Sequence, residues 1–411
     1  MAPNKRSRLF DGITVAPRCM VVDRSTLAVK PVVDRLFHAI TGSDAPGVPR
    51  GEMQWTSALA DHVVSIEPVK GVRSPRTLER KMNAEVRALN AALARYDAML
   101  LPTAAHPFMD PAAETVLWPG QGREVYATYD RVLGCRQHGW SNSQSLRLDL
   151  PFGTDEEFTK LHAAVRLVLP IVPALCASSP LLQGVAAEAL DARLLSWEQR
   201  AAKVPELAGP IIPEVVFSQE DYYREIFAPI GKALAGVDQR SVLDHLSANA
   251  RVAVARFDRG VISVRAIDAQ ECVGADLAVA EVVTAVVKAM VQGRWVSTYL
   301  QRAWSETDLG AIYRRTIKDG LKAVINDKDY LLMFGVLREG KMTARELWAH
   351  LLEQTRAGLS EHVLLHVSSI LKNGNVAERI LKRTGRKPSR EKIVQVYREL
   401  AACLVEDRVF D

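Results

Sequence analysis

The sequence predicts an α+β protein that ends in a helical C-terminal region. Three observations support this class. Short segments between residues 8 and 268 alternate apolar and polar side chains, as strands do. Residues 74–100 carry apolar side chains at three- and four-residue spacing, which is typical of an amphipathic helix. From Trp295 onward the predicted elements are all helices.

Strands and helices are interspersed along the first 300 residues. A predicted strand at 8–23 contains Ala16 and Pro17, and because proline lacks a ladder donor we expect an edge or a bulge there. Pro170 and Pro173 are expected to interrupt an apolar central helix. The other predicted elements are a helix at 29–40, strands at 53–57 and 63–66, a helix at 74–100 leading into a short buried strand, a helix and a strand within 123–150, a long loop with a short helix at 185–232, a helix at 275–292, and helices at 305–335, 343–357, 360–372 and 390–404.

The composition is that of a soluble globular protein with one large core or two domains. The chain has 411 residues, of which 48% are hydrophobic and 25% charged. The net charge of +5 is dispersed among nearly as many acids, which argues against nucleic-acid binding. The N-terminus has no apolar run suited to a signal peptide or a membrane anchor, so we expect neither export nor membrane attachment.

The five cysteines are odd in number and widely spaced, and no two of them form a C-x-x-C pair. This pattern argues against both a disulfide framework and a zinc site. Reduced thiols are typical of proteins from a reducing compartment. We therefore expect a cytoplasmic protein.

The stretch 256–272 predicts a strand that carries charge beside a turn. Ile262 and Val264 fall on one face, and Ser263 and Arg265 fall on the other. A guanidinium among apolar strand residues suggests a site for a carboxylate or a phosphate. An Arg–Asp pair that closes the sheet edge explains the same residues equally well.

Several short motifs occur together along the chain: T-x-x-H-P-F, which holds His106, then Y-D-R, H-G-W-x-N-x-Q-S, A-S-S-P and F-D-R-G. In combination they resemble the carboxylate–amine ligases, the type-2 glutamate–cysteine ligase family. The resemblance implies a glutamine-synthetase-like fold, in which a curved, mostly antiparallel sheet has helices packed behind it and its concave face forms the site. We expect a catalytic-fold domain at 1–335 and a helical region at 336–411.

The sequence departs from this family where the resemblance implies metal ligands. Thr14, Ala16, Ala58 and Ser263 stand where carboxylates for magnesium are expected, and Arg147 stands in place of a histidine. Magnesium binds chiefly carboxylate oxygens. A unit charge at 4 Å is worth about 4 kcal/mol at an effective dielectric near 20, so this inversion of charge disfavours a divalent ion. We expect no metal and no catalytic residue, with Arg147 as a fixed cation in the vacated space.

The basic residues of the family pattern are retained. The resemblance places five of them where an anion such as a small carboxylate or a nucleotide would bind. These residues are His106, Arg131, Arg256, Arg259 and Arg265.

These features predict a catalytically degenerate homologue that supports or regulates an active paralogue, within a heteromer or a homo-oligomer. A first alternative is an active ligase that uses ATP and magnesium and recruits other acids, namely Asp61, Glu67, Asp149 or Asp268. Convergence of these acids in space would favour it. A second alternative is a sensor of a small carboxylate or nucleotide.

Overall fold

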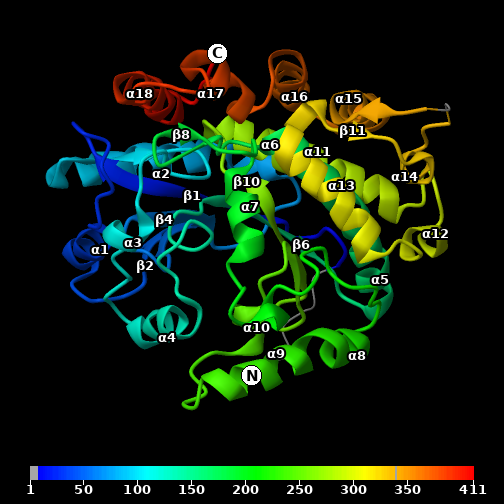
Figure 1. Cartoon of the computed structure of the whole chain (residues 1–411), viewed down its shortest axis with the longest axis horizontal. Coiled ribbons are helices and arrows are strands. Elements are labelled where there is room, and N and C mark those ends of the chain that lie inside the picture. Colours follow the sequence, from blue (N-terminus) through cyan, green and yellow to red (C-terminus); the bar gives the residue numbers. More distant parts are fainter. Residues whose placement is uncertain (1–7, 338–339) are drawn as a thin grey trace.

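The computed structural model describes residues 8–337 and 340–411, so the first seven residues of the basic N-terminus lie outside the described part. An eight-stranded antiparallel sheet forms its centre (Figure 1). The strand order is β2-β3-β4-β1-β6-β10-β9, and β5 also pairs with β1. The bounds are β1 Thr14–Asp23, β2 Gly47–Arg50, β3 Met53–Ser57, β4 Val63–Pro68, β5 Ala98–Leu101, β6 Ser145–Pro151, β9 Ala253–Arg256 and β10 Val261–Asp268. The predicted α+β class with an antiparallel sheet is confirmed.

Strand β1 is continuous, so the predicted interruption at Ala16 and Pro17 is wrong. β1 pairs with β6 up to Pro17, which faces Leu146, and pairs with β4 from Arg18 onward. Pro17 therefore lies at the end of the ladder with β6 and one residue before the ladder with β4, which runs along the opposite side of β1. Its missing N–H is tolerated at this position, where one side of the continuous strand has no ladder partner.

The two faces of β1 have different roles. On one face, Val15, Cys19 and Val21 enter the main hydrophobic core. On the other face, Met20 and Val22 join a second apolar cluster under the C-terminal helices. Residues 14, 16 and 18 lie on this second face but at the opposite end of the strand, where the surface is polar. This alternation separates the core from a polar surface along a single strand.

Helices cover both faces of the sheet and supply most of the core. Their bounds are α1 Val33–Thr41, α2 Glu79–Leu93, α3 Pro111–Glu114, α4 Arg123–Leu133, α5 Asp155–Val168, α6 Val172–Cys176, α7 Ala192–Gln199, α8 Gln219–Tyr222, α9 Ala228–Val237, α10 His245–Ala248, α11 Val273–Val291, α12 Thr298–Arg302, α13 Glu306–Asp319, α14 Lys328–Leu332, α15 Ala344–Thr355, α16 Glu361–Asn373, α17 Val376–Thr384 and α18 Arg390–Glu406. Most predicted helices are present. The segment 185–232 contains more helix than expected, and α17 was not predicted.

The stretch Asp155–Cys176 contains α5 and α6, with Pro170 and Pro173 between and at the start of these helices, as predicted. It is long and apolar enough to cross a membrane by length and composition. However, 89% of its apolar window is buried inside the protein. This burial is typical of the core helix of a soluble protein.

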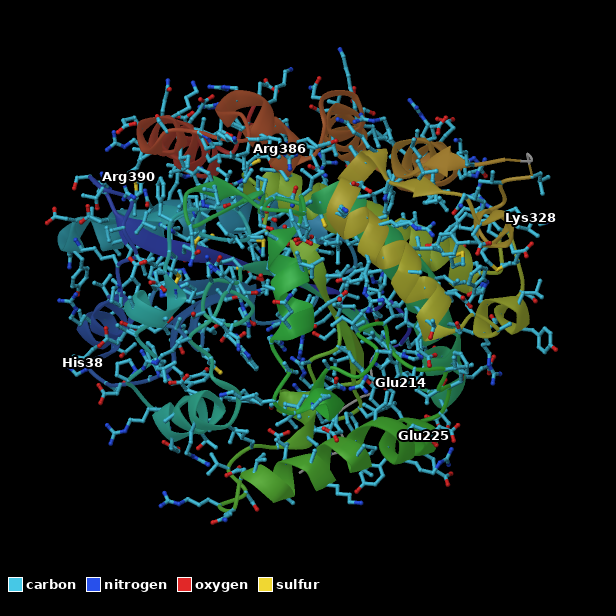
Figure 2. The ribbon with its side chains drawn as sticks, viewed as in Figure 1. His38, Glu214, Glu225, Lys328, Arg386 and Arg390 are labelled. Carbon is cyan, nitrogen blue, oxygen red and sulfur yellow. The ribbon has the colours of Figure 1, made fainter. Side chains whose placement is uncertain are left out.

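The C-terminal helices α15, α16, α17 and α18 lie along one edge of the molecule (Figure 1). Trp348 on α15 is fully buried, and its indole N–H donates to the carbonyl of Ile171 at 2.8 Å. Arg386, in the turn between α17 and α18, and Arg390, the first residue of α18, lie exposed at the same edge (Figure 2). The division into 1–335 and 336–411 stays a prediction.

Candidate functional site

A cavity of about 560 Å³ lies over the polar face of the sheet. Strands β1, β6 and β10 form its floor, and residues of α4, α7 and α10 form its walls. Six of the lining residues are arginines, and none of the lining residues is Asp or Glu. The arginines are Arg18, Arg147, Arg200, Arg256, Arg259 and Arg265. The cavity is therefore strongly electropositive.

Antiparallel register aligns the floor residues across three strands. Asp149 on β6 faces Thr14 on β1 and Ser263 on β10. Directly paired residues share a face of the sheet, so these three side chains form a row. The Ser263 hydroxyl donates a hydrogen bond of 2.5 Å to Asp149. Arg147 lies two residues from Asp149 on the same face, opposite Ala16.

Arg147 binds two carboxylates at once. Its Nη2 lies 2.7 Å from Glu67 Oε2, and its Nε lies 3.3 Å from Asp149 Oδ2. Burial lowers the pKa of Arg147, but the charges of Asp149 and Glu67 outweigh burial and raise it. Burial likewise raises the pKa of Glu67, and the Arg147 charge and the Thr56 hydroxyl outweigh this effect and lower it. Arg147 thus pairs with two carboxylates on this face instead of pointing into bulk solvent.

Two other cavity arginines also lie near acids. Arg256 forms a two-pronged pair with Asp258, at 2.9 and 2.7 Å, in the turn between β9 and β10. This is the Arg–Asp pair that the sequence offered as an alternative, and Arg256 nevertheless lines the cavity. Arg259 lies 3.8 Å from Asp149, which it shares with Arg147.

The remaining three arginines have no carboxylate within ion-pairing distance in the described chain. Arg265 donates to the carbonyl of Asn249 at 2.9 Å, and burial lowers its pKa to about 10. Burial, followed by the charge of Arg147, lowers the pKa of Arg18. Burial, followed by the charge of Arg265, lowers the pKa of Arg200 well below its ordinary value. Glu67 and Asp149 act on Arg18 and Arg265, respectively, from beyond ion-pairing distance.

The structure brings part of the predicted site together. Ala58, Arg147 and Ser263 line the cavity. Thr14 and Ala16 lie on the same face of the sheet, in register with Asp149 and Arg147. Arg256, Arg259 and Arg265 also line the cavity, as expected of anion-binding residues.

His106 and Arg131 are not brought to this cavity. His106 is buried, its Nε2 lies 2.6 Å from the carbonyl of Leu27, and its Nδ1 accepts the Met109 N–H at 2.9 Å. Burial lowers its pKa to about 4, so it is neutral at pH 7 and does not attract anions. Arg131 is 56% exposed and lies 3.5 Å from Asp238, outside the cavity lining.

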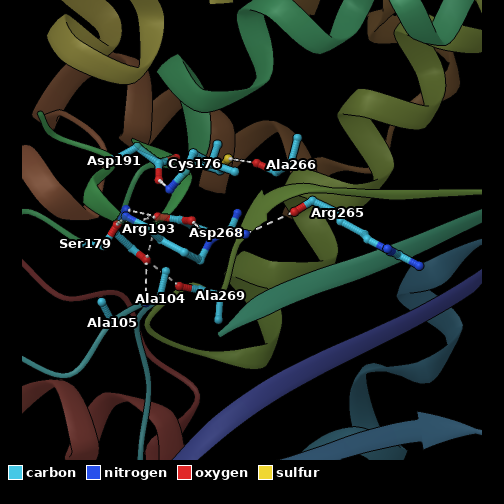
Figure 3. A network of polar contacts seen from close by, with 12 residues as sticks. Ala104, Ala105, Cys176, Ser179, Asp191, Arg193, Arg265, Ala266, Asp268 and Ala269 are labelled. Carbon is cyan, nitrogen blue, oxygen red and sulfur yellow. Dashed lines mark hydrogen bonds and ion pairs between the residues drawn. The ribbon is translucent and has the colours of Figure 1, made fainter. Parts of the chain in front are cut away.

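The acids offered for an active ligase do not form a metal site. Asp61 accepts the backbone N–H of Asp34 at 2.8 Å, at the first turn of α1. Asp268 is fully buried in an ion pair with Arg193 and accepts from Ser178 N at 2.8 Å (Figure 3). Glu67 and Asp149 converge, but on Arg147. Across residues 8–337 and 340–411, no group of three or more His, Cys, Asp or Glu side chains is placed to hold a metal ion. The donor set therefore does not fit magnesium.

Two cavity arginines were missed from the sequence. Arg18 follows Thr14 and Ala16 at two-residue spacing, so strand periodicity alone could have placed it on the same face. Arg200 follows α7, and its guanidinium carbon lies 3.3 Å from the Trp197 ring centroid and 4.3 Å from that of Trp140. No local sequence signal brings residues 140 and 200 together.

Comparison with known proteins gives a family and a fold. The family model described as glutamate-cysteine ligase family 2 matches residues 22–399. An uncharacterized protein of Archaeoglobus fulgidus is 26% identical over 380 residues, which cover 92% of this chain and 95% of that protein.

Two crystal structures share the fold at 11% identity each. The Francisella tularensis glutamate–cysteine ligase, solved in complex with AMP, aligns with a TM-score of 0.63 over 97% of this chain and 90% of its own. A bifunctional glutathione synthetase from Pasteurella multocida aligns with a TM-score of 0.64 over 95% of this chain and 52% of its own. The chain thus spans about half of the second protein and nearly all of the first.

Proposed function

Because the chain belongs to glutamate–cysteine ligase family 2, we propose that it is a catalytically degenerate member which supports or regulates an active carboxylate–amine ligase. One observation carries this proposal. Arg147 lies in the middle of the polar sheet face and forms ion pairs with Glu67 and Asp149, two carboxylates that reach that face.

This arrangement opposes the chemistry of an ATP-dependent ligase. Such an enzyme needs a divalent cation to neutralise the nucleotide phosphates, and the cation needs carboxylate ligands. Here the guanidinium of Arg147 is paired with both carboxylates, and Arg259 lies 3.8 Å from Asp149. Each positive charge at about 4 Å disfavours a cation by about 4 kcal/mol at an effective dielectric near 20.

The supporting role follows from what the chain retains. The fold aligns over 97% of this chain and 90% of the Francisella tularensis glutamate–cysteine ligase, which supports a chain that has its full set of sheet and helices available for association. A chain that keeps the fold but not the metal site can act through association with an intact paralogue. Purification from the native source should therefore recover such a paralogue with this chain, and recovery of the chain alone would count against the supporting role.

The degenerate state is tested by calorimetric titration of ATP into the purified chain, with magnesium and then with a chelator. We expect the binding heat to be the same in both conditions, and no amide formation when glutamate and an amine are added. Tight binding that requires magnesium, together with turnover, would contradict the proposal. It would mean that Arg147 withdraws to free Glu67 and Asp149 for a metal, which is the active-ligase alternative.

A further inference from the structure

The cavity carries more positive charge than its own carboxylates neutralise. Six guanidinium groups line it, and three carboxylates lie within ion-pairing distance of them, namely Glu67, Asp149 and Asp258. An excess of about three positive charges remains in one partly enclosed space. Unpaired charge in a low-dielectric site is costly, so such a site favours an anionic ligand.

The excess is concentrated on Arg18, Arg200 and Arg265, which come from β1, the end of α7 and β10. These three elements are distant in sequence, and each of them contributes one of these arginines to the cavity lining. Arg200 is only 7% exposed, and its Nε has no hydrogen-bond partner in the described chain. Burial, which removes these guanidinium groups from water, lowers the pKa of each of the three.

Arg200 is held in a fixed orientation although it lacks an acid partner. Its guanidinium stacks against Trp197 and Trp140, at 3.3 and 4.3 Å from the two ring centroids. Stacking of this kind stabilises a cation while leaving its N–H groups free to donate. A buried donor that is preorganised and unpartnered is suited to receiving an oxyanion from the cavity.

We propose that the cavity binds, without a divalent cation, a small polyanion that carries about three negative charges on phosphoryl or carboxyl groups. Guanidinium groups match the oxygens of both with paired hydrogen bonds, and a volume of about 560 Å³ suits a small molecule. This inference rests on the proposed function, since a site without a metal is its premise, and it names the ligand through which the chain is regulated.

The test is calorimetry on the full chain in a chelator-containing buffer, with tripolyphosphate and citrate as the two probes. Saturable binding of either probe supports the proposal. Binding of tripolyphosphate at least tenfold tighter than citrate assigns phosphoryl chemistry, and the reverse assigns carboxyl chemistry. The absence of saturable binding for both probes would overturn the proposal.

Two matched substitutions locate the binding site. Arg18→Gln removes an unpaired cavity charge, so we expect the affinity for the better probe to fall at least tenfold. Arg131→Gln removes an arginine outside the cavity and should change the affinity less than twofold. Arg18→Lys keeps the charge but not the planar fork, so we expect an intermediate loss. If Arg18→Gln binds within twofold of the wild-type chain, the cavity is not the site and the proposal is wrong.

Melting temperatures separate a ligand-binding role from a structural one. Because Arg18 is unpaired, Arg18→Gln without ligand should melt at the same temperature as the wild-type chain or higher. The upward shift produced by the polyanion in the wild-type chain should be lost. A lower melting temperature with binding retained would make Arg18 structural and overturn the proposal.

The proposed function and the ligand inference can be refuted independently of each other. Magnesium-dependent turnover would refute the degenerate function whatever the polyanion does. Absence of turnover together with absence of polyanion binding would refute only the ligand inference.

Discussion

Arg147 is the residue on which both the site and its stability depend. Its side chain is 21% exposed, and those of its partners Glu67 and Asp149 are 13% and 4% exposed. Removing one partner of a buried pair leaves the other charge uncompensated, which costs about 3 kcal/mol. Arg147→Gln should therefore lower the free energy of unfolding by about this amount at pH 7, as measured by denaturant titration. The control Arg356→Gln breaks a surface pair with Glu353, and its effect should stay below about 0.5 kcal/mol.

The effect of Arg147→Gln should depend on pH. In the native chain the pKa of Glu67 is lowered, so its contribution to stability is present above its unfolded pKa, near 4.5, and is lost as pH falls through the lower folded value. Below that value Glu67 is protonated, so its ion pair with Arg147 no longer stabilises the wild-type chain. The difference in unfolding free energy between wild type and Arg147→Gln should thus shrink as pH is lowered from 7 towards 3. A difference that stays constant over this range would contradict the ion-pair explanation.

Asp61 offers a pH dependence of the opposite sign. Burial, followed by the charge of Asp34, raises its pKa to about 8. The folded state therefore holds a proton that the unfolded state releases near pH 4, and stability falls as pH rises between these values. Asp61→Asn can still accept the Asp34 N–H, and it should be more stable than the wild-type chain by about 2 kcal/mol at pH 8. Melting curves recorded from pH 4 to 8 measure how the stability of each chain depends on pH. An equal dependence on pH for the wild-type chain and Asp61→Asn would contradict this explanation.

A second aspartate provides the contrast for that experiment. Hydrogen bonding from Lys30, and then from Ser25 and Thr26, holds the pKa of Asp23 well below its ordinary value. Its contribution is present above pH 4 and is lost as pH falls, so Asp23→Asn should destabilise the chain at neutral pH.

Among single residues, strand positions were more predictable than contacts made by tertiary structure. Ser263 and Arg265 were assigned correctly to one face because strand side chains alternate with a fixed period. The stacking of Arg200 on Trp140 could not be predicted, since the two residues meet only when the chain between them is folded. His106 failed as an anion-binding candidate because a motif gives no information on burial.

At the scale of elements, periodicity located the sheet and most of the helices. Periodicity gave wrong predictions where neighbouring elements determine the local structure. Pro17 is tolerated inside β1 because the ladder with β4 begins only at the next residue, a property of the neighbouring strands and not of β1 itself. Helix α17, which was not predicted, begins at a capping box formed by Asn375 and Glu378.

The packing of α11 on α16 depends on a glycine in the first turn of α11. A Cβ at Gly274 would lie 3.2 Å from the Nε2 atoms of both His362 and His366 on α16. Overpacking typically costs 1–3 kcal/mol, so Gly274→Val should reduce the free energy of unfolding by about 2 kcal/mol. Gly231 in α9 is the matched control, because no atom lies within 4 Å of its Cβ position. Gly231→Val should change stability by less than about 0.5 kcal/mol. Equal effects at the two sites, measured by chemical denaturation, would refute the packing argument.

For the whole molecule, the C-terminal helices share the core of the rest of the chain. Leu347, Trp348 and Leu351 on α15 and Val367 on α16 are fully buried in the main hydrophobic cluster. The helix α18 covers the second cluster, which includes Met20 and Val22 of β1. The sheet strand that carries the polar face of the cavity is thus also the strand on which the last helix packs.

Because the core is shared, we expect the chain beyond residue 335 to be necessary for folding. Truncation would expose the apolar surface under α15, α16 and α18 and remove several fully buried side chains, each worth about 3 kcal/mol or more. The sum exceeds the 5–15 kcal/mol that stabilises a typical protein. The fragment 1–335 expressed alone should therefore lack a cooperative melting transition and bind a hydrophobic dye, whereas co-expression with 336–411 should restore both the transition and the cavity's affinity for polyanions. Cooperative melting of 1–335 alone would instead establish the two-part division that the sequence predicts, with the C-terminal helices as a separate unit docked on the sheet.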